Sequence, residues 1–221
     1  SSIMGIYPAP FIARLKNQGI KWFATVTSVT EALAAEAAGA DVIVAQGVEA
    51  GGHRGSFNSE DVSRSLVGLF SLLPAVVDAV KIPVVATGGI GDARGIAAAL
   101  LLGASAVQIG TGLLRTPESG INSAWANAIG SALPEDTVPT RAFSGRLGRS
   151  IRTAYTEAAE KGPKPAPYPI QRNLTKAMRD SAMNIDTMQA WAGQSAGLAR
   201  AEPATELVRE LWTTAKKLLK S

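Results

Sequence analysis

The sequence predicts an α/β fold built around a parallel sheet. Short apolar runs alternate with alanine-rich stretches of helical character four times in the first half of the chain. The runs are apolar throughout, which is typical of strands that helices bury on both faces. Each run ends in small residues, so a ligand can approach the backbone at the carboxyl edge of the sheet. Four successive βα units fit either a doubly wound sheet or a (β/α) barrel.

Strands and helices alternate regularly between residues 21 and 109. The apolar runs predict strands at residues 21–26, 41–45, 82–87 and 106–109. The stretches between them predict helices at residues 31–38, 59–80 and 93–102. Thr30 and Asp92 stand where the first and last of these helices need an N-cap, and Gly39 and Gly103 follow their ends.

The pattern changes after residue 114. Residues 116–139 are weakly amphipathic and are predicted to be helical. Residues 161–169 contain four prolines, which exclude a helix or a central strand and predict an ordered loop or a hinge. The last helix is expected to begin near Pro203, because proline suits the first turn. Its apolar residues form one stripe: Leu207, Leu211, Ala215 and Leu218.

Composition excludes several classes of protein. The 221 residues are 46% hydrophobic and 18% charged, with a net charge of +4, which excludes a disordered chain. No apolar run approaches the roughly 20 residues of a membrane span. The absence of cysteine excludes disulfide scaffolds, thiolate zinc sites, iron–sulfur clusters and cysteine nucleophiles. It also fits a reducing compartment, and we expect a cytoplasmic location.

Positive charge is concentrated in the segment 141–152, which contains Arg141, Arg146, Arg149 and Arg152. This cluster and the pI of about 9.5 are features of nucleic-acid-binding proteins. However, only 5% of the residues are aromatic, which is too few for base-stacking platforms. We therefore interpret the arginines as solvated or ion-paired, and we expect neither nucleic acid nor a membrane as a partner.

Residues 45–55 contain the strongest candidate for catalysis. The segment reads Ala-Gln-Gly-Val-Glu-Ala-Gly-Gly-His-Arg-Gly and includes His53, the one histidine of the chain. A neutral imidazole at the end of a buried strand can act as a base near neutral pH, and the flanking glycines let the loop lie flat against a planar ligand. The alternative is a loop histidine satisfied by local hydrogen bonds. A metal site is not expected, because the sequence has no second histidine or cysteine.

Two glycine-rich segments follow neighbouring strands and indicate phosphate binding. Residues 87–92, Thr-Gly-Gly-Ile-Gly-Asp, lead into a predicted helix, and residues 108–112, Gln-Ile-Gly-Thr-Gly, end the next strand. Exposed amides at a helix start hold phosphate well, and adjacent βα loops of barrel enzymes frequently share a phosphate site. Each segment alone also fits an ordinary tight turn. Together they predict a phosphate-bearing ligand.

With these motifs the sequence resembles the nitronate monooxygenase family. The matching segments are residues 46–55, 86–90 and 107–111, with weaker matches at residues 143–146 and 191–194. The resemblance covers essentially the whole chain, and the histidine segment is its most specific part. It implies an α/β fold of the (β/α)8 TIM-barrel type, of which this chain would hold about strands five to eight, with a small inserted helical domain.

The resemblance also implies domain limits and a site. Residues 1–115 would form the C-terminal half of an FMN-binding barrel, residues 116–184 the helical insertion, and residues 185–221 helices that return to the barrel. His53 would be the catalytic base. The FMN-binding residues would be Gln46, Gly51, Gly52, Gly88, Gly89, Gln108, Ile109, Gly110 and Thr111. Among them, the phosphate would be held by Gly88, Gly89, Gly110 and Thr111, and the ribityl chain and flavin ring would lie along Gln46, Gly51 and Gln108.

The implied activity is the FMN-dependent oxidation of alkyl nitronates, such as propionate 3-nitronate, with dioxygen to a carbonyl compound and nitrite. His53 would act as the base when the substrate is a neutral nitroalkane. Two alternatives stay open. One is an FMN-dependent enoyl-[acyl-carrier-protein] reductase, which shares the glycine–histidine motif. The other is a non-catalytic, truncated half barrel.

The first three strands of the family have no counterpart in this sequence, which begins Ser1-Ser2 without an initiator methionine. We therefore expect a start within a longer protein. A half barrel has two open sheet edges and an uncovered inner face. The chain is accordingly expected to form a homo-oligomer or to pair with a missing N-terminal half.

Overall fold

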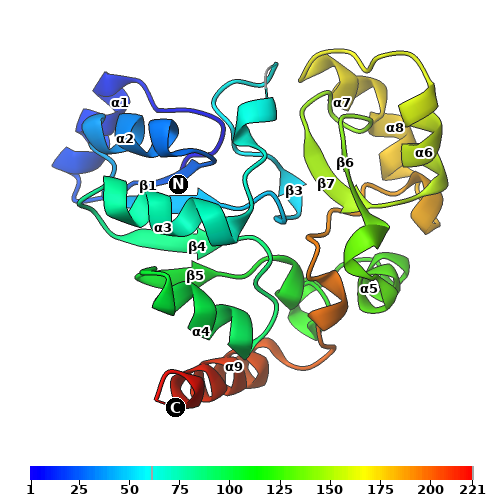
Figure 1. The fold of residues 1–221 in the computed structure, drawn as a ribbon. Coiled ribbons are helices and arrows are strands. Elements are labelled where there is room, and N and C mark those ends of the chain that lie inside the picture. The colour runs from blue at the N-terminus through cyan, green and yellow to red at the C-terminus, as the bar shows by residue number, and fades with distance from the viewer. Residues whose placement is uncertain (61, 221) are drawn as a thin grey trace.

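A computed structural model describes residues 1–60 and 62–220 and arranges them in two lobes (Figure 1). The first lobe contains a parallel sheet of β1 (Phe23–Val26), β2 (Val42–Gln46), β4 (Val84–Thr87) and β5 (Ala106–Gln108). The order of these strands in the sheet, β1-β2-β4-β5, is their order along the chain. A doubly wound sheet reverses its strand order at a switch point, whereas a barrel does not. The topology therefore favours a barrel-type arrangement.

Helices connect the strands and pack on the sheet. α1 (Ala9–Asn17) precedes β1, and the crossover helices are α2 (Val29–Ala37), α3 (Leu69–Ala79) and α4 (Ala93–Leu101). Right-handed crossovers between successive parallel strands place all three on one face. Asp92 caps α4 as predicted, with its carboxylate accepting from two backbone amides at 3.0 and 3.1 Å. Ser28 rather than Thr30 caps α2, because the Ser28 hydroxyl accepts from the Glu31 amide and Thr30 already lies in the first turn.

The two faces of the parallel sheet differ in burial. Side chains in contact with the helical layer are fully covered: Ala24, Ile43, Ala45 and Ala86. On the opposite face Phe23 is 39% exposed. Ala106 and Gln108 of the edge strand β5 are exposed as well. On this face Val44 and Gln46 of the central strand β2 are buried, so the expectation of strands buried on both faces fails only toward the sheet edges, where no helix covers the sheet.

The second lobe is built on a small antiparallel sheet. Its strands are, in spatial order, β3 (Gly52–His53), β7 (Gly148–Ile151) and β6 (Thr137–Thr140). Its helices are α5 (Ser123–Ser131), α6 (Ala154–Lys161), α7 (Ile170–Leu174) and α8 (Lys176–Asp180). The helix predicted over residues 116–139 needs correction, because its α-helical part is confined to α5 and residues 137–140 form strand β6. Thr137 and Val138 are β-branched and favour a strand, and Pro139 is tolerated because β6 lies at the sheet edge.

The C-terminal residues are divided between the two lobes. Small residues of the segment 190–199 join the hydrophobic cluster of the second lobe: Ala190, Ala192, Ala196 and Ala199. α9 (Ala204–Leu218) packs against α4 and contributes Leu207, Leu211 and Ala215 to the cluster of the first lobe. Within residues 185–221, it is therefore α9 that packs on the barrel-type lobe. Neither α9 nor another helix in the described part of the chain is long and apolar enough to span a bilayer.

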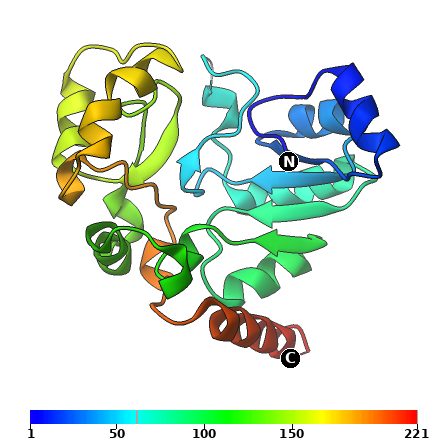
Figure 2. The ribbon, with the colours of Figure 1, turned by 180° about the vertical axis from the view of Figure 1, so that it is seen from behind.

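The strands of the parallel sheet run toward the second lobe. Seen from behind (Figure 2), the arrowheads of β2 and β4 are directed toward that lobe. β3 follows β2 along the chain and pairs with β7, so His53 lies opposite Gly148. The carboxyl ends of the strands, where ligands bind in parallel α/β folds, consequently face the boundary between the lobes.

Candidate functional site

A cavity of about 230 Å³ opens at the carboxyl end of the parallel sheet. Gln46, Thr87 and Gln108 line it, and these three residues are paired in register on neighbouring strands. Residues paired in this way point to one face of a sheet, and here it is the less covered face. The rest of the wall comes from the loops after β2, β4 and β5, together with Gly193 and Ser195.

Most of the residues predicted for the site meet in this cavity. Its lining includes His53, Gln46, Gly51, Gly88, Gly89, Gln108, Gly110 and Thr111. Ile109 instead lines an apolar groove on the other side of β5, because successive residues of a strand point to opposite faces. Gly52 borders a separate small recess next to β3. The structure thus places Ile109 and Gly52 beside the site and not in its lining.

Several lining residues were not predicted. Some belong to the glycine-rich segments that were already noted: Thr87, Ile90 and Gly112. Others come from distant parts of the chain: Ile3, Thr25, Gly193 and Ser195. The first group could have been found from the motifs. In the second group only Gly193 lies in a segment that was noted, and Ile3, Thr25 and Ser195 have no local signal because they reach the cavity through tertiary packing.

The glycine loops form an open cradle of backbone groups. Gly88 and Gly89 adopt φ angles of +101° and +70°, which residues with a Cβ rarely adopt. At Gly110, an added Cβ would meet no atom within 4 Å, so the space in front of this backbone is open. Within the described residues, the amides of Gly89, Gly110 and Thr111 donate to no acceptor. Unpaired N–H groups at neighbouring strand ends suit a phosphate.

The loop at residues 193–195 ties the two glycine loops together. The Gly193 amide donates to Thr111 Oγ1 at 2.9 Å, and the Ser195 hydroxyl donates to the Gly89 carbonyl oxygen at 2.5 Å. The backbone of Gly51 also approaches this loop closely, since a Cβ at Gly51 would lie 2.5 Å from the Gly193 nitrogen. The cavity wall is therefore braced by contacts between four segments that are separate in sequence.

Gln46 and Arg54 hold the histidine loop in place. The side-chain oxygen of Gln46 accepts from the Gly55 amide at 2.8 Å, and its Nε2 donates to the His53 carbonyl at 3.1 Å. The buried guanidinium of Arg54 donates to the carbonyls of Gln46 and Gly47 at 2.7 and 2.6 Å. Burial lowers the pKa of Arg54 to about 10, so the group remains charged at neutral pH. Both side chains thus fix the backbone from which His53 projects.

His53 links the cavity to the second lobe. Its Nε2 lies 2.7 Å from the hydroxyl oxygen of the fully buried Ser144. The imidazole packs beside the rings of Trp191 and Tyr168, at centroid distances of 5.1 and 6.1 Å. Burial, followed by the positive charges of two arginines, lowers the pKa of His53 to about 4. The imidazole is consequently neutral at physiological pH and able to accept a proton.

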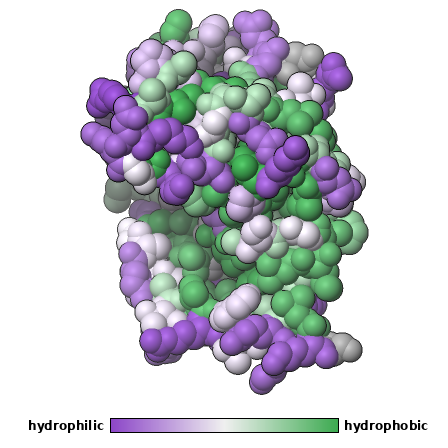
Figure 3. All heavy atoms as spheres, turned by 90° about the vertical axis from the view of Figure 1, so that its left-hand side faces the viewer, coloured by the Kyte–Doolittle hydropathy of each residue, from purple (hydrophilic) through white to green (hydrophobic). Residues whose placement is uncertain are grey.

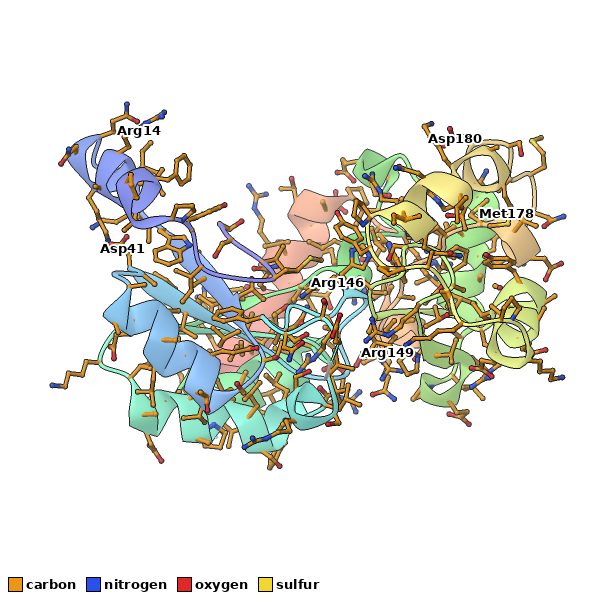
Figure 4. The ribbon with its side chains drawn as sticks, turned by 90° about the horizontal axis from the view of Figure 1, so that it is seen from above. Arg14, Asp41, Arg146, Arg149, Met178 and Asp180 are labelled. Carbon is orange, nitrogen blue, oxygen red and sulfur yellow. The ribbon has the colours of Figure 1, made fainter. Side chains whose placement is uncertain are left out.

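Positive charge gathers on the second-lobe side of the site. Arg146 and Arg149 lie at the boundary between the lobes (Figure 4) and are both buried. Arg146 donates to the Ser56 carbonyl, and Arg149 donates to Val48 and Thr137 at 3.1 Å each. Across residues 1–60 and 62–220, no carboxylate forms an ion pair with either arginine. Glu31 and Glu49 offset these charges only from a longer distance, so the two guanidinium groups still favour an anionic ligand nearby.

Comparisons with known proteins agree with this geometry. A family model described as nitronate monooxygenase matches residues 1–214. A probable nitronate monooxygenase of Staphylococcus aureus is 45% identical over 211 residues, which cover 94% of this chain and 59% of that protein. The fold superposes on nitroalkane oxidase from Streptomyces ansochromogenes with a TM-score of 0.91 and 42% identity, covering 97% of this chain and 63% of that one.

A second solved structure is also similar. FabK from Thermotoga maritima superposes with a TM-score of 0.81 and 32% identity, covering 96% of this chain and 66% of that one. The chain spans about three fifths of the length of the curated relatives it matches. Its match to the family model nevertheless extends over almost all of its residues, including every residue that lines the cavity. The chain therefore belongs to the nitronate monooxygenase family.

Proposed function

We propose that this chain forms the flavin and substrate site of an enzyme that oxidises alkyl nitronates with dioxygen to a carbonyl compound and nitrite. The observation that supports this most is the position of His53. A neutral imidazole lines a cavity whose other wall is a cradle of unpaired backbone amides. The site thus combines a base with a place for a phosphate-bearing cofactor.

FMN is the cofactor that we infer for this cavity. Gly88, Gly89, Gly110 and Thr111 would hold its phosphate, since the space before Gly110 is open and the neighbouring amides lack acceptors. The in-register side chains of Gln46 and Gln108, together with the Gly51 backbone, would lie along the ribityl chain and the flavin ring. Bound FMN would supply the one-electron oxidation of the nitronate that a protein side chain cannot perform.

The protein residues act on the substrate before the redox chemistry. With a neutral nitroalkane, His53 takes the proton from the carbon next to the nitro group, and the electron pair of that bond delocalises into the nitro group. The nitronate so formed is an anion, and the charges of Arg146 and Arg172 near His53 favour it. With a preformed nitronate the proton is already gone. The base is then not required.

The substrate pair nitroethane and ethyl nitronate tests this role directly. For His53→Asn, we expect kcat/KM for nitroethane to fall by at least about 100-fold, which is a typical contribution of a general base. Nitrite release from ethyl nitronate or propionate 3-nitronate should stay within a few-fold of the wild type. Equal losses on neutral and ionised substrates would argue against the base role.

Similarity to FabK favours one second candidate, the enoyl-[acyl-carrier-protein] reductase considered from the sequence. That activity needs reduction by NADH or NADPH, whereas nitronate oxidation does not. Anaerobic mixing of the FMN-loaded protein with NADH discriminates the two. Rapid bleaching of the flavin by NADH, without nitrite release from any nitronate, would favour the reductase. Binding of FMN with neither reaction would favour a non-catalytic barrel fragment.

We further propose that the parallel sheet associates with additional barrel strands, either from an N-terminal half or from another copy. The exposed face of β1 and β5 and the apolar groove lined by Val107, Val208 and Trp212 support this proposal. Exposed strand edges and apolar patches of this kind are usually covered in the functional protein.

A further inference from the structure

We propose that Ser144 is a positioning residue that selects one tautomer of His53 and leaves Nδ1 as its basic atom. The inference rests on the proposed function, in which His53 removes a proton from a neutral nitroalkane. It goes further, because it assigns the ring nitrogen that takes the proton. It also assigns a second-lobe residue that determines this choice.

Three polar groups surround the Ser144 hydroxyl. His53 Nε2 lies 2.7 Å from Oγ, the Arg146 carbonyl oxygen lies at 3.2 Å and the Arg146 amide nitrogen at 3.3 Å. Ser144 has no exposed surface, so bulk water cannot replace any of these partners. A hydroxyl offers one proton and two lone pairs. Its hydrogen-bonding capacity therefore matches its three neighbours, one for one.

One arrangement satisfies all three neighbours. The Arg146 carbonyl can only accept, so it takes the Ser144 proton. The Arg146 amide can only donate, so it occupies one lone pair of Oγ. The second lone pair then accepts from Nε2–H of His53. In the reverse arrangement Oγ–H would donate to Nε2, and the carbonyl of the buried Arg146 would lose its serine partner, which costs free energy.

The consequence is that the lone pair of neutral His53 sits on Nδ1. Among the described residues, Nδ1 has no hydrogen-bond partner, whereas Nε2 is held by Ser144. The ring is packed beside Trp191 and Tyr168, which oppose its rotation. When a nitroalkane C–H bond breaks, the proton moves to Nδ1 and the electron pair stays with the nitronate. The Nε2–H bond to Ser144 persists in the imidazolium, so the anchor does not rearrange.

Because His53 is the one histidine of the chain, NMR can read this tautomer without assignment. We would label the 221-residue protein with 15N-histidine and record imidazole spectra near neutral pH, without flavin or substrate. The wild type should show a pyrrole-type Nε2 with a slowly exchanging proton and a pyridine-type Nδ1. In Ser144→Ala the slowly exchanging proton should disappear, and the tautomer ratio should shift by roughly tenfold toward that of free imidazole.

Ser150→Ala is the matched control. Ser150 is also a fully buried serine of the second lobe, and its hydroxyl donates to the Ala190 carbonyl at 2.9 Å. This variant should leave the His53 spectrum unchanged. A wild-type spectrum with the proton on Nδ1 would overturn the inference, and so would a Ser144→Ala spectrum that keeps the protected Nε2 proton. The wild-type spectrum decides the tautomer even if Ser144→Ala does not fold.

Kinetics separate this inference from the proposed function. Ser144→Ala should lower kcat for nitroethane about tenfold with little change in KM, and it should spare ethyl nitronate. Equal losses on the two substrates would contradict a positioning role in proton transfer. If the wild type with FMN releases no nitrite from either substrate but shows the expected Nε2 proton, the proposed function fails and the tautomer assignment stands.

Discussion

His53 is neutral in the folded protein because burial and two nearby arginines act in the same direction on its pKa. In the unfolded chain the group regains an ordinary pKa of about 6.5. Below that pH the unfolded chain binds a proton that the folded protein does not bind. The free energy of unfolding therefore falls as the pH drops from about 6.5 toward 4.

This linkage gives a prediction for His53→Asn. Between about pH 7 and pH 4.5, the wild type should lose about 2 kcal/mol of stability that the variant does not lose. Urea unfolding of both proteins at the two pH values measures the difference. Asp41 does not obscure this difference. Its pKa is lowered to about 2, chiefly by the hydrogen bond from Lys16. The stability that the ionised Asp41 contributes is therefore lost only below about pH 4.5. Parallel pH dependences in the two proteins would contradict the half-buried, neutral state of His53.

At the scale of single residues, sequence motifs predicted the site where its chemistry is local. The glycines after β4 and β5 were found because phosphate binding needs free backbone amides at strand ends. Ile109 was assigned to the site because the motif was taken as a unit, although strand alternation turns it away from Gln108. Ser144 could not be found as a partner of His53. The two residues are 91 positions apart, and only tertiary packing joins them.

At the scale of elements, the N-cap of α4 determines which backbone amides near the cavity are already paired and which are free. Asp92 caps this helix and uses the amides of Arg94 and Gly95, so these two amides of the first turn are already paired. Its carboxylate also forms an ion pair with the Arg94 guanidinium at 2.6 Å. The amides of Arg94 and Gly95 are therefore not available to the proposed phosphate, in contrast to those of Gly89, Gly110 and Thr111.

Asp92→Ala tests whether the start of α4 contributes to FMN binding. Loss of the cap should cost about 1 kcal/mol of stability. FMN affinity should stay within about threefold of the wild type, because an N-cap carboxylate that binds amides contributes nothing to the phosphate cradle. Asn122→Ala is a suitable control, since Asn122 caps α5 in the second lobe through the Ala124 amide at 2.8 Å. An affinity loss of tenfold in Asp92→Ala alone would show that α4 takes part in the cradle.

The strands of the first lobe were predictable because each βα unit is a local pattern, whereas α1 was not predicted and α3 begins at Leu69 and not at residue 59. The predicted strands match β1, β2, β4 and β5 to within about two residues at most ends, as expected for boundary estimates. The second lobe was less predictable. β3, β6 and β7 are short, and β3 pairs with a strand that lies almost 100 residues later. Such non-local pairing leaves no periodic signal in the sequence.

For the whole molecule, the main feature is that the cavity depends on both lobes. The parallel sheet supplies the amide cradle and the polar row of side chains, and the second lobe supplies Ser144 and Trp191 around His53. The β3–β7 pairing fixes this relation, because it places His53 opposite Gly148. A Cβ at Gly148 would lie 2.9 Å from the Trp191 ring, so the second lobe packs tightly beside this pairing.

The outer surface of the first lobe is unusually apolar. Seen from the side of α1 and α2 (Figure 3), hydrophobic side chains form a broad exposed area between hydrophilic regions above and below. Large exposed hydrophobic residues of this lobe include Phe70, Leu101, Val208 and Trp212. Areas of this kind mark contacts with other polypeptide segments. They agree with the proposal that further strands complete the sheet.

The most direct test of the account is a titration of the 221-residue protein with FMN and, separately, with riboflavin, followed by quenching of flavin fluorescence. If backbone amides at adjacent strand ends hold the phosphate, FMN should bind one to one. Riboflavin, which lacks that phosphate, should bind at least about tenfold more weakly, since a charge-assisted hydrogen bond contributes about 1.5 kcal/mol or more. Equal affinity for the two flavins would contradict the central claim.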